Sequence, residues 1–514
     1  MNLTQLVLEK NDPETCDRPP GETISTDKAA LPGIVRLCER LKDERIDYCH
    51  WKSNAAIDRS ASGDNDLDLL VGRADAQRFS ELLTQLGYKE IQVLPEEQLP
   101  GIRDFYGFDE AAARLIHVHA HFQLVLGHDL TKNYRLAIES PYLASAIQRD
   151  LFRIPAQEFE LVLLVIRLVL KHSTLDAILM RHGRLSTSER RELEFLLSPA
   201  TLEKSYPLLE QHLPFISRNL FEACLQALQP GCSFWERIRV GGRLQRKLES
   251  CARRPQIADV FLKLWRRLEQ PVVYRLHLRR PQRRLAHGGL LVAIIGGDGS
   301  GKTTVVNDLR QRFSEEFDVK KVHLGKPPWS WTTIVVRGIL KIGRSLGLYP
   351  YVNEGTEPSV DTNSPSFPGY PWLIREVCTG RDRYLEYLRA RRFATNGGLV
   401  ICDRFPLSQL KIVDGPQVER VTREIKRNRV IKLLATIEHY YYRQIISPDL
   451  LIVLRVDPEI CVQRKTDETS DSVRSRSQEM WEVDWCGTRA HIIDASRSKS
   501  QVMSDVLNVV WSHL

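Results

Sequence analysis

The feature that most constrains this chain is a glycine-rich loop at residues 296–303, which reads Gly-Gly-Asp-Gly-Ser-Gly-Lys-Thr. An apolar run at 291–295 precedes the loop, and Val306, Leu309 and Phe313 follow it at helical spacing. A strand, a tight turn and a helix in this order match the pattern GxxxxGK[ST], whose backbone N–H groups and helix N-terminus bind phosphate oxygens. The sequence therefore predicts an α/β domain that binds a nucleotide through its phosphates.

The chemistry of such a loop assigns roles to its residues. Lys302 is expected to bridge the β- and γ-phosphates, and the Thr303 hydroxyl is expected to be a ligand of Mg²⁺. ATP and Mg²⁺ are therefore the expected cofactors. An accidental glycine-rich turn is the alternative, but the strand, lysine, threonine and helix are all in place. The expected nucleotide-binding residues are Gly296, Gly297, Asp298, Gly299, Ser300, Gly301, Lys302, Thr303 and Thr304.

Short apolar runs alternate with helical patterns throughout residues 289–514. The strand candidates are 291–295, 399–402, 450–456 and 491–493. This alternation predicts a parallel sheet sandwiched by helices. A stretch rich in Pro, Ser and Trp at 327–370 interrupts the pattern, and we expect it to form a loop or lid over the edge of the sheet.

Four segments of this region resemble, in order and spacing, the thymidylate kinases and related nucleoside monophosphate kinases. The first is the loop itself, in which an acidic residue precedes Gly-x-Gly-Lys. The others are Gly398-Leu-Val-Ile-Cys-Asp403-Arg404-Phe405, then Pro448-Asp449 with its strand and Asp457-Pro458-Glu459, and finally Ile493-Asp494-Ala495. The resemblance implies transfer of the γ-phosphoryl group of ATP to a nucleoside monophosphate or a similar phosphorylated acceptor, and often a homodimer.

An acceptor phosphate is already anionic at neutral pH, so the reaction requires charge neutralisation rather than a general base. The resemblance places Arg404 at the phosphates and Asp403 beside Mg²⁺ or its waters. It also assigns Arg383 to the acceptor side. Solvated surface charge is the alternative for each arginine. The expected catalytic residues are Lys302, Arg404, Asp403 and Arg383, with Arg464, Arg474 and Arg476 as arginines of a lid.

One segment departs from the family pattern. Thymidylate kinases typically carry an Arg-Glu-Pro-Gly-Gly-Thr loop after the second strand, which helps form the acceptor pocket. Here the corresponding residues are Val322-His323-Leu324-Gly325-Lys326-Pro327. The sequence therefore predicts phosphoryl transfer and leaves the acceptor open.

A second candidate site, formed by two aspartates, lies in an N-terminal α/β region at 29–150. Asp66 and Asp68 share one face of an expected strand at 67–71, where two carboxylates can hold a divalent metal. With Lys52-Ser53 upstream, the segment resembles the nucleotidyltransferase fold, and most closely an uncharacterised nucleotidyltransferase-like family. In that family an all-helical region follows the α/β domain, which agrees with the helical pattern expected after residue 150.

This second resemblance is incomplete. Lys52 replaces the usual glycine, and His119 stands where a third carboxylate is expected. His117, His119 and His121 share one face of a strand, which suits a metal site, although we favour hydrogen-bonded histidines because no nearby acid or Cys completes a ligand set. We favour a degenerate substrate-binding module over an active nucleotidyltransferase. A third alternative is that the C-terminal domain is a nucleotide-gated switch for this module.

The middle of the chain is expected to be helical from 151 to 235, with a capping box at Ser186 and Glu189 and a helical pattern over 208–228. Residues 236–288 then hold 15 Lys/Arg and 4 Asp/Glu. The resulting excess of 11 positive charges is larger than the formal net charge of the whole chain, +8. We expect a basic helical connector here. Its apolar stripe suits an anionic membrane or nucleic acid, but we favour packing against the kinase-like domain. The stripe is Ile257, Val260, Phe261, Leu264, Trp265 and Leu268, with Lys263, Arg266 and Arg267 opposite.

Targeting and redox signals complete the sequence-based predictions. The longest apolar stretch, 161–170, is about half the length that a bilayer requires, and residues 1–28 are expected to be a flexible leader without a signal-peptide pattern. The ten cysteines show no CxxC pair, as expected of reduced thiols. We therefore expect a cytoplasmic protein.

Overall fold

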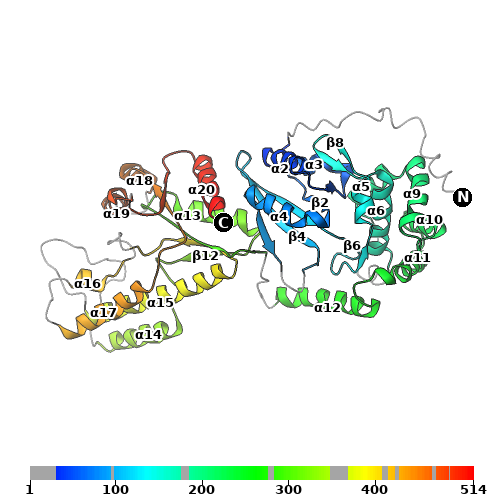
Figure 1. The fold of residues 1–514 in the computed structure, drawn as a ribbon. Helices are drawn as coiled ribbons and strands as arrows, with labels where there is room; N and C mark the ends of the chain where they lie inside the picture. The colour runs from blue at the N-terminus through cyan, green and yellow to red at the C-terminus, as the bar shows by residue number, and fades with distance from the viewer. Residues whose placement is uncertain are drawn as a thin grey trace. The chain divides into compact units, whose positions relative to one another are not determined.

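The computed structural model describes residues 30–93, 98–174, 185–275, 283–347, 369–407, 415–422, 428–465, 470–485 and 487–514 (Figure 1). The expected leader at 1–28 lies outside the described residues. The chain divides into two compact units, Met1–Pro281 and Gln282–Leu514. Both units are mixed α/β, with many helices around their sheets.

The N-terminal unit contains a mixed sheet with the strand order β1-β2-β5-β4-β3. The β1–β2 pair is antiparallel, β2 and β5 are parallel, and β4 is antiparallel to both β5 and β3. The expected strand at 67–71 and the expected strand that carries His117, His119 and His121 are confirmed as β2 and β5, whereas β3 and β4 were not predicted. The bounds are β1 (Tyr48–His50), β2 (Leu67–Val71), β3 (Lys89–Gln92), β4 (Ile102–Asp109) and β5 (Arg114–His121).

Two amphipathic helices provide the apolar cover of this sheet. Helix α2 (Pro32–Asp43) begins with a proline at its first turn, where the missing N–H costs nothing, and buries Ile34 and Leu37. Helix α4 (Ala76–Gln85) buries Phe79 and its neighbours, and Gly87, at φ +80°, allows the chain to turn away after it. Both helices pack into one core with the strands.

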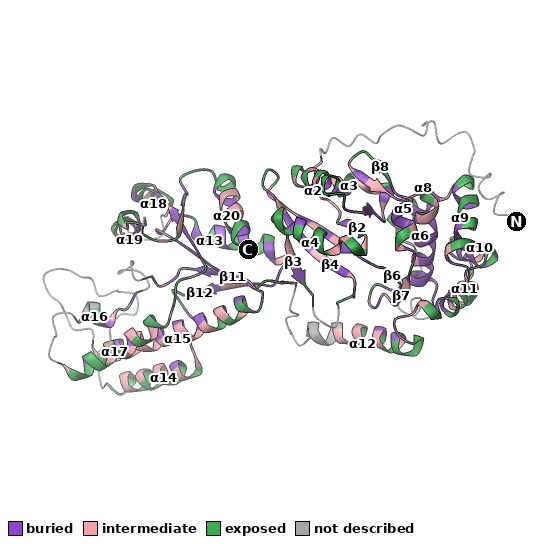
Figure 2. Cartoon of the chain, in the orientation of Figure 1, coloured by how far each residue is buried: buried purple, intermediate pink, exposed green. Residues whose placement is uncertain are grey.

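A helical core follows in the same unit, with α6 (Gln157–His172) at its centre (Figure 2). Nearly every face of α6 is buried, and its neighbours are α8 (Thr187–Leu196), α9 (Pro199–His212), α10 (Arg218–Ala227) and α11 (Phe234–Lys247). The capping box of Ser186 and Glu189 is confirmed at the start of α8. The helical pattern expected over 208–228 is divided between the end of α9 and α10, because Ser217 caps the start of α10.

The basic segment differs from the expected connector in two ways. Helix α11 buries Val240 and Leu244 in the helical core, so the start of the segment belongs to that core. In α12 (Gln256–Arg275), the apolar stripe is exposed, with Ile257 at 87% and Leu268 at 67%. Lys263, expected on a solvated face, is instead buried and pairs with Asp259 at 2.7 Å.

The C-terminal unit has a five-stranded, fully parallel sheet with the order β12-β13-β11-β14-β15. The four predicted strands are confirmed, and β12 is additional. Strand β11, which leads into the glycine-rich loop, is central, so it is buried on both faces. The bounds are β11 (Leu290–Gly296), β12 (Val319–His323), β13 (Leu399–Asp403), β14 (Leu450–Arg455) and β15 (Ala490–Asp494).

Helices cover both faces of this sheet (Figure 1). Helices α13 (Lys302–Ser314) and α20 (Lys499–His513) pack together on one face, and α15 (Tyr370–Thr395) covers the other with α17 (Arg429–Arg443) beside it. The loop or lid expected at 327–370 is partly wrong, because Trp331–Ser345 forms helix α14 and packs along α15. Residues 348–368 of that segment lie outside the described residues.

Membrane-spanning helices and cysteines were both considered in the sequence. Across the described ranges, no helix combines the length and apolarity needed to span a bilayer. Cys38, Cys49, Cys224, Cys402 and Cys461 are buried free thiols.

Candidate functional site

The glycine-rich loop joins β11 to α13 through backbone conformations that suit glycine. Gly299 has φ +89° and Gly301 has φ +88°, the left-handed region that costs other residues about 1–2 kcal/mol. Gly301 is the N-cap residue of α13, so the first N–H groups of that helix follow the turn directly. The loop therefore presents backbone donors at a helix N-terminus.

Two helices pack against one side of the loop and leave no space for side chains there. A Cβ on Gly299 would lie 2.6 Å from the carbonyl oxygen of Cys461 in α18 (Pro458–Arg464), and one on Gly297 would lie 2.8 Å from Ser477 Oγ in α19 (Ser470–Glu482). The side chains of Thr303 and Thr304, by contrast, are exposed. Access to the loop is therefore from the threonine side.

Lys302 reaches back across the loop from the first turn of α13. Its Nζ donates to the carbonyl oxygen of Gly297 at 2.7 Å and lies 3.6 Å from Asp298 Oδ1. Burial lowers the pKa of Lys302, and the Asp298 carboxylate opposes that effect. The ammonium group is thus held over the loop by a backbone oxygen that a phosphate oxygen can replace.

Asp403 and Arg404 reach the same place from the neighbouring strand. Parallel pairing sets Asp403 beside Ile294, and the Arg404 N–H donates to the Ile294 carbonyl oxygen at 3.3 Å. Arg404 has φ +66°, and its guanidinium pairs with Asp298 Oδ1 at 3.1 Å. Asp298 is therefore a shared partner of Lys302 and Arg404, which the motif alone did not predict.

Arg383 is buried on α15 and binds the segment that follows β12. Its Nε donates to the Leu324 carbonyl oxygen at 2.6 Å, and its Nη2 donates to the Gly325 carbonyl oxygen at 3.1 Å. A further hydrogen bond joins it to the Tyr442 hydroxyl. Arg383 thus supports the backbone of the segment that follows β12.

The arginines expected in a lid have their recorded contacts elsewhere. Arg464 donates to the Ala495 carbonyl oxygen at 3.0 Å, beside the end of β15. Arg474 pairs with Glu459 at 2.7 Å, and the side chain of Arg476 lies outside the described part of the chain. In the described part of the chain, Arg464 and Arg474 thus bind residues outside the glycine-rich loop.

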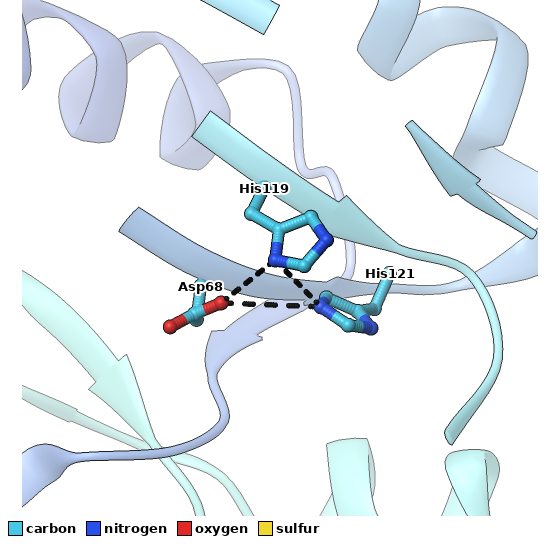
Figure 3. A group of neighbouring side chains, drawn as sticks. All are labelled: Asp68, His119 and His121. Atoms are coloured by element: carbon cyan, nitrogen blue, oxygen red, sulfur yellow. Dashed lines mark hydrogen bonds and ion pairs between the residues drawn. The ribbon is translucent and has the colours of Figure 1, made fainter. Parts of the chain in front are cut away.

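A second polar cluster lies in the N-terminal unit, where Asp68, His119 and His121 converge (Figure 3). Asp68 Oδ1 lies 3.1 Å from His119 Nδ1 and 3.9 Å from His121 Nε2. The two ring nitrogens are 3.3 Å apart. Lys52 Nζ approaches the same Asp68 oxygen at 2.8 Å, and burial together with this second cation lowers the pKa of nearby Lys132 to about 8.

The third histidine and the second carboxylate of the sequence prediction form a separate group. His117 Nδ1 contacts Asp66 at 2.9 Å, while its Nε2 contacts Asp104 at 2.8 Å. Burial acts to lower the pKa of His117, but the bonds to Asp104 and Asp66 raise it to about 9. The expected pair of Asp66 and Asp68 is therefore divided, because each carboxylate has its own basic partners.

Two carboxylates from the helical core hold the turn that carries Lys52. The N–H of Ser53 donates to Glu192 at 2.9 Å, and the side chain of Asn54 donates to Glu160 at 3.0 Å. Sequence reasoning missed both acids and also Asp104. Glu160 had a usable signal, because it is the acid directly before the apolar run at 161–166 of this helix.

The comparisons with known proteins cover less than half of the chain, and no protein-family profile matches it. A stretch of 227 residues, 43% of the chain, is 27% identical to 86% of the "Uncharacterized ATP-binding protein YghR" of Escherichia coli K12. The protein YghS of the same strain, also named an ATP-binding protein, is 24% identical over 44% of the chain and 93% of its own length. A thymidylate kinase of Symbiobacterium thermophilum is 26% identical over 43% of the chain and 92% of its own length. Together with the GxxxxGK[ST] motif, these similarities support a P-loop ATP-binding region of kinase-like character in this chain.

Proposed function

We propose that the C-terminal unit is an ATP- and Mg²⁺-dependent phosphotransferase that transfers the γ-phosphoryl group to a phosphorylated acceptor, as the resemblance to thymidylate kinases implies. The observation that carries the proposal is the meeting of Lys302 and Arg404 at one glycine-rich loop, from two neighbouring parallel strands. Two cations and a helix N-terminus at one point favour an anion that gains charge in the transition state.

The residues present fit ATP and Mg²⁺. The loop is free of side chains where its glycines meet α18 and α19, and the exposed Thr303 and the Asp403 carboxylate offer oxygen ligands of the kind that Mg²⁺ prefers. Bound Mg²⁺ supplies neutralisation of the phosphate charge. Lys302, which now donates to the Gly297 carbonyl oxygen, would bind the β- and γ-phosphates, and Arg404, paired with Asp298, would neutralise charge on the transferring group.

A cavity beside Phe405 supports an anionic acceptor. It has a volume of about 1090 Å³, and its lining includes Tyr442, His439, Arg443 and Arg489 together with one carboxylate, Asp449, which pairs with Arg391. A cavity of this size accepts a nucleotide-sized ligand, and its basic residues favour a phosphate. Arg383 reaches this wall through Tyr442, which accounts for its proposed acceptor-side role as a positioning residue.

The proposal is tested by measuring ADP formation from ATP and Mg²⁺ with a panel of nucleoside monophosphates and phosphorylated sugars. We expect at least one acceptor to stimulate ADP formation and to gain a phosphate that mass spectrometry detects. ATP binding without acceptor-stimulated ADP formation across the panel contradicts the proposal and favours a nucleotide-gated switch.

A further inference from the structure

The cluster of Asp68, His119 and His121 has the dimensions of a metal site. A tetrahedral ion with bonds of 2.0–2.2 Å to nitrogen and oxygen holds its ligand atoms about 3.4 Å apart. The three separations here are 3.1, 3.3 and 3.9 Å. Strand pairing produces this arrangement, because Asp68 lies opposite His119 across parallel strands and His121 is two residues further on the same face.

Within this cluster, three atoms that can each offer a lone pair converge on one another. If His119 Nδ1 carries a proton for Asp68, the only proton between the three atoms is used, and His121 Nε2 faces the pair with a lone pair. If His121 Nε2 carries the proton instead, His119 and the Asp68 carboxylate turn lone pairs toward each other. His121 is fully buried, and its Nδ1 has no hydrogen-bond partner among the described residues. A cation at the centre uses all three lone pairs at once.

We propose that Asp68, His119 and His121 bind a divalent transition-metal ion of the zinc class. Two imidazoles and one carboxylate are a ligand set that zinc prefers and Mg²⁺ does not, since Mg²⁺ takes oxygen ligands and keeps its waters. The ligand set is distinct from the pair of aspartates that the sequence suggested for Mg²⁺. The side chain of Asp66 is 59% exposed and contacts His117 instead.

The cluster is partly exposed on the side of Lys52, His119 and Asp68. His121 closes the inner side of the site, whereas the side chains of Lys52, His119 and Asp68 are 22%, 18% and 13% exposed. Three protein ligands with an open fourth position are typical of catalytic rather than structural zinc. Lys52 Nζ forms an ion pair with Asp68 Oδ1 at 2.8 Å. A metal ion that binds Asp68 therefore competes with the Lys52 ammonium group for this oxygen.

Titration of the full chain with Co²⁺, without nucleotide, tests this site because four-coordinate cobalt absorbs visible light. We expect one Co²⁺ per chain, displaced by Zn²⁺ and not by Mg²⁺, with no thiolate-to-cobalt charge transfer. His119→Gln and His121→Gln are each expected to weaken binding by more than about 100-fold, above the range of outer-shell substitutions. His117→Gln, on the same strand face, is the matched control and is expected to leave the affinity unchanged.

Lys52→Met separates loss of the site from loss of the fold. Removal of the competing ammonium group is expected to tighten Co²⁺ binding several-fold, which a misfolded chain does not do. The proposal is overturned if the unsubstituted chain binds no Co²⁺, if His119→Gln and His121→Gln bind it as tightly as His117→Gln does, or if Lys52→Met binds it more weakly. None of these outcomes depends on phosphotransferase activity in the other unit.

Discussion

Each unit holds a lysine beside a buried aspartate, but the two turns that carry these lysines are held in different ways. Lys302 Nζ lies 3.6 Å from Asp298, and Lys52 Nζ lies 2.8 Å from Asp68. The Lys302 turn takes its shape from glycines with positive φ. The Lys52 turn has a serine at φ +61°, and the acceptors Glu160 and Glu192 from distant helices hold it.

The difference shows two solutions to one structural problem. A glycine loop is specified by consecutive residues, so it forms wherever the strand and helix flank it. The Lys52 turn depends on carboxylates 106 and 139 positions away in the chain. The first turn is therefore vulnerable to added side chains, and the second to changes in remote acceptors.

The charge balance of the two sites also differs. At the glycine-rich loop, Lys302 and Arg404 share the Asp298 carboxylate at a helix N-terminus, and Asp403 on the neighbouring strand is the proposed oxygen ligand of Mg²⁺. At Asp68, a carboxylate meets one lysine and two imidazole nitrogens that offer lone pairs. The first arrangement favours an anion, and the second has the ligands for a cation.

The largest expected effect is that of Lys302→Ala on phosphoryl transfer. Loss of a cation aimed at developing phosphate charge typically costs about 10²–10³-fold in rate, and we expect that fall in kcat/KM for ATP. Lys321→Ala is the matched control, because Lys321 is a surface lysine of the same unit whose Nζ contacts Asn307 at 2.8 Å. Equal ADP formation by the two variants would mean that the loop does not bind the transferred phosphate.

The next largest effect is expected from Glu160→Gln, and it depends on pH. Burial is the main cause that raises the pKa of Glu160 from 4.5 to about 7, against the hydrogen bonds from Asn54. Between these two values the native chain holds the proton and the unfolded chain does not, so the free energy of unfolding falls as the pH rises through this window. The full cost, about 3 kcal/mol, is present above pH 7 and absent below pH 4.5.

Glutamine cannot ionise, so Glu160→Gln is expected to be more stable than the parent at pH 8 and equal to it near pH 4.5. Thermal unfolding of the full chain at both pH values measures this, and the transition that does not shift with added ATP reports the N-terminal unit. A constant difference at the two pH values would show that Glu160 is ionised throughout and that Asn54 satisfies it fully.

The same contrast explains what the sequence predicted. The glycine-rich loop and the four strands around it were predictable because their signals are contiguous: apolar runs, glycines and a lysine in fixed order. The hydrogen bonds of Arg383 to Leu324 and Gly325 join residues 59 and 58 positions apart, and no local pattern reports such a pairing.

Periodicity also describes a helix without saying which face is buried. The stripe of α12 has the spacing of a core-facing helix, yet Phe261 and Trp265 are exposed while Lys263 and Asp259 are buried as a pair.

The sequence predicted only part of the cluster of Asp68, His119 and His121. Alternation placed the histidines on one face, but only the pairing of β2 with β5 shows that Asp68 meets His119 and His121 rather than His117.

A smaller effect is expected from Gly299→Ala in the self-supporting turn. A residue other than glycine at φ +89° is strained, and the added Cβ would lie 2.6 Å from the Cys461 carbonyl oxygen, so we expect a loss of about 2 kcal/mol in the C-terminal unit. Gly338→Ala is the matched control in helix α14, where a Cβ meets nothing within 4 Å and is expected to stabilise by about 0.5–1 kcal/mol. The ATP-sensitive unfolding transition measures both. Similar shifts in the two variants would show that the loop relaxes around a side chain.

The smallest effect is expected from exchanging serine and glycine between the two turns. Ser53 is left-handed at φ +61° and Gly301 at φ +88°, and a Cβ on Gly301 meets nothing within 4 Å, so the exchange tests backbone strain without steric contact. Gly301→Ser is expected to destabilise the ATP-sensitive transition by about 1 kcal/mol. Ser53→Gly removes the strain but adds conformational entropy to the unfolded chain, so we expect a change below about 1 kcal/mol in the other transition. A large loss in Ser53→Gly would contradict the comparison, because it would mean that the serine side chain, and not Glu160 and Glu192, holds the Lys52 turn.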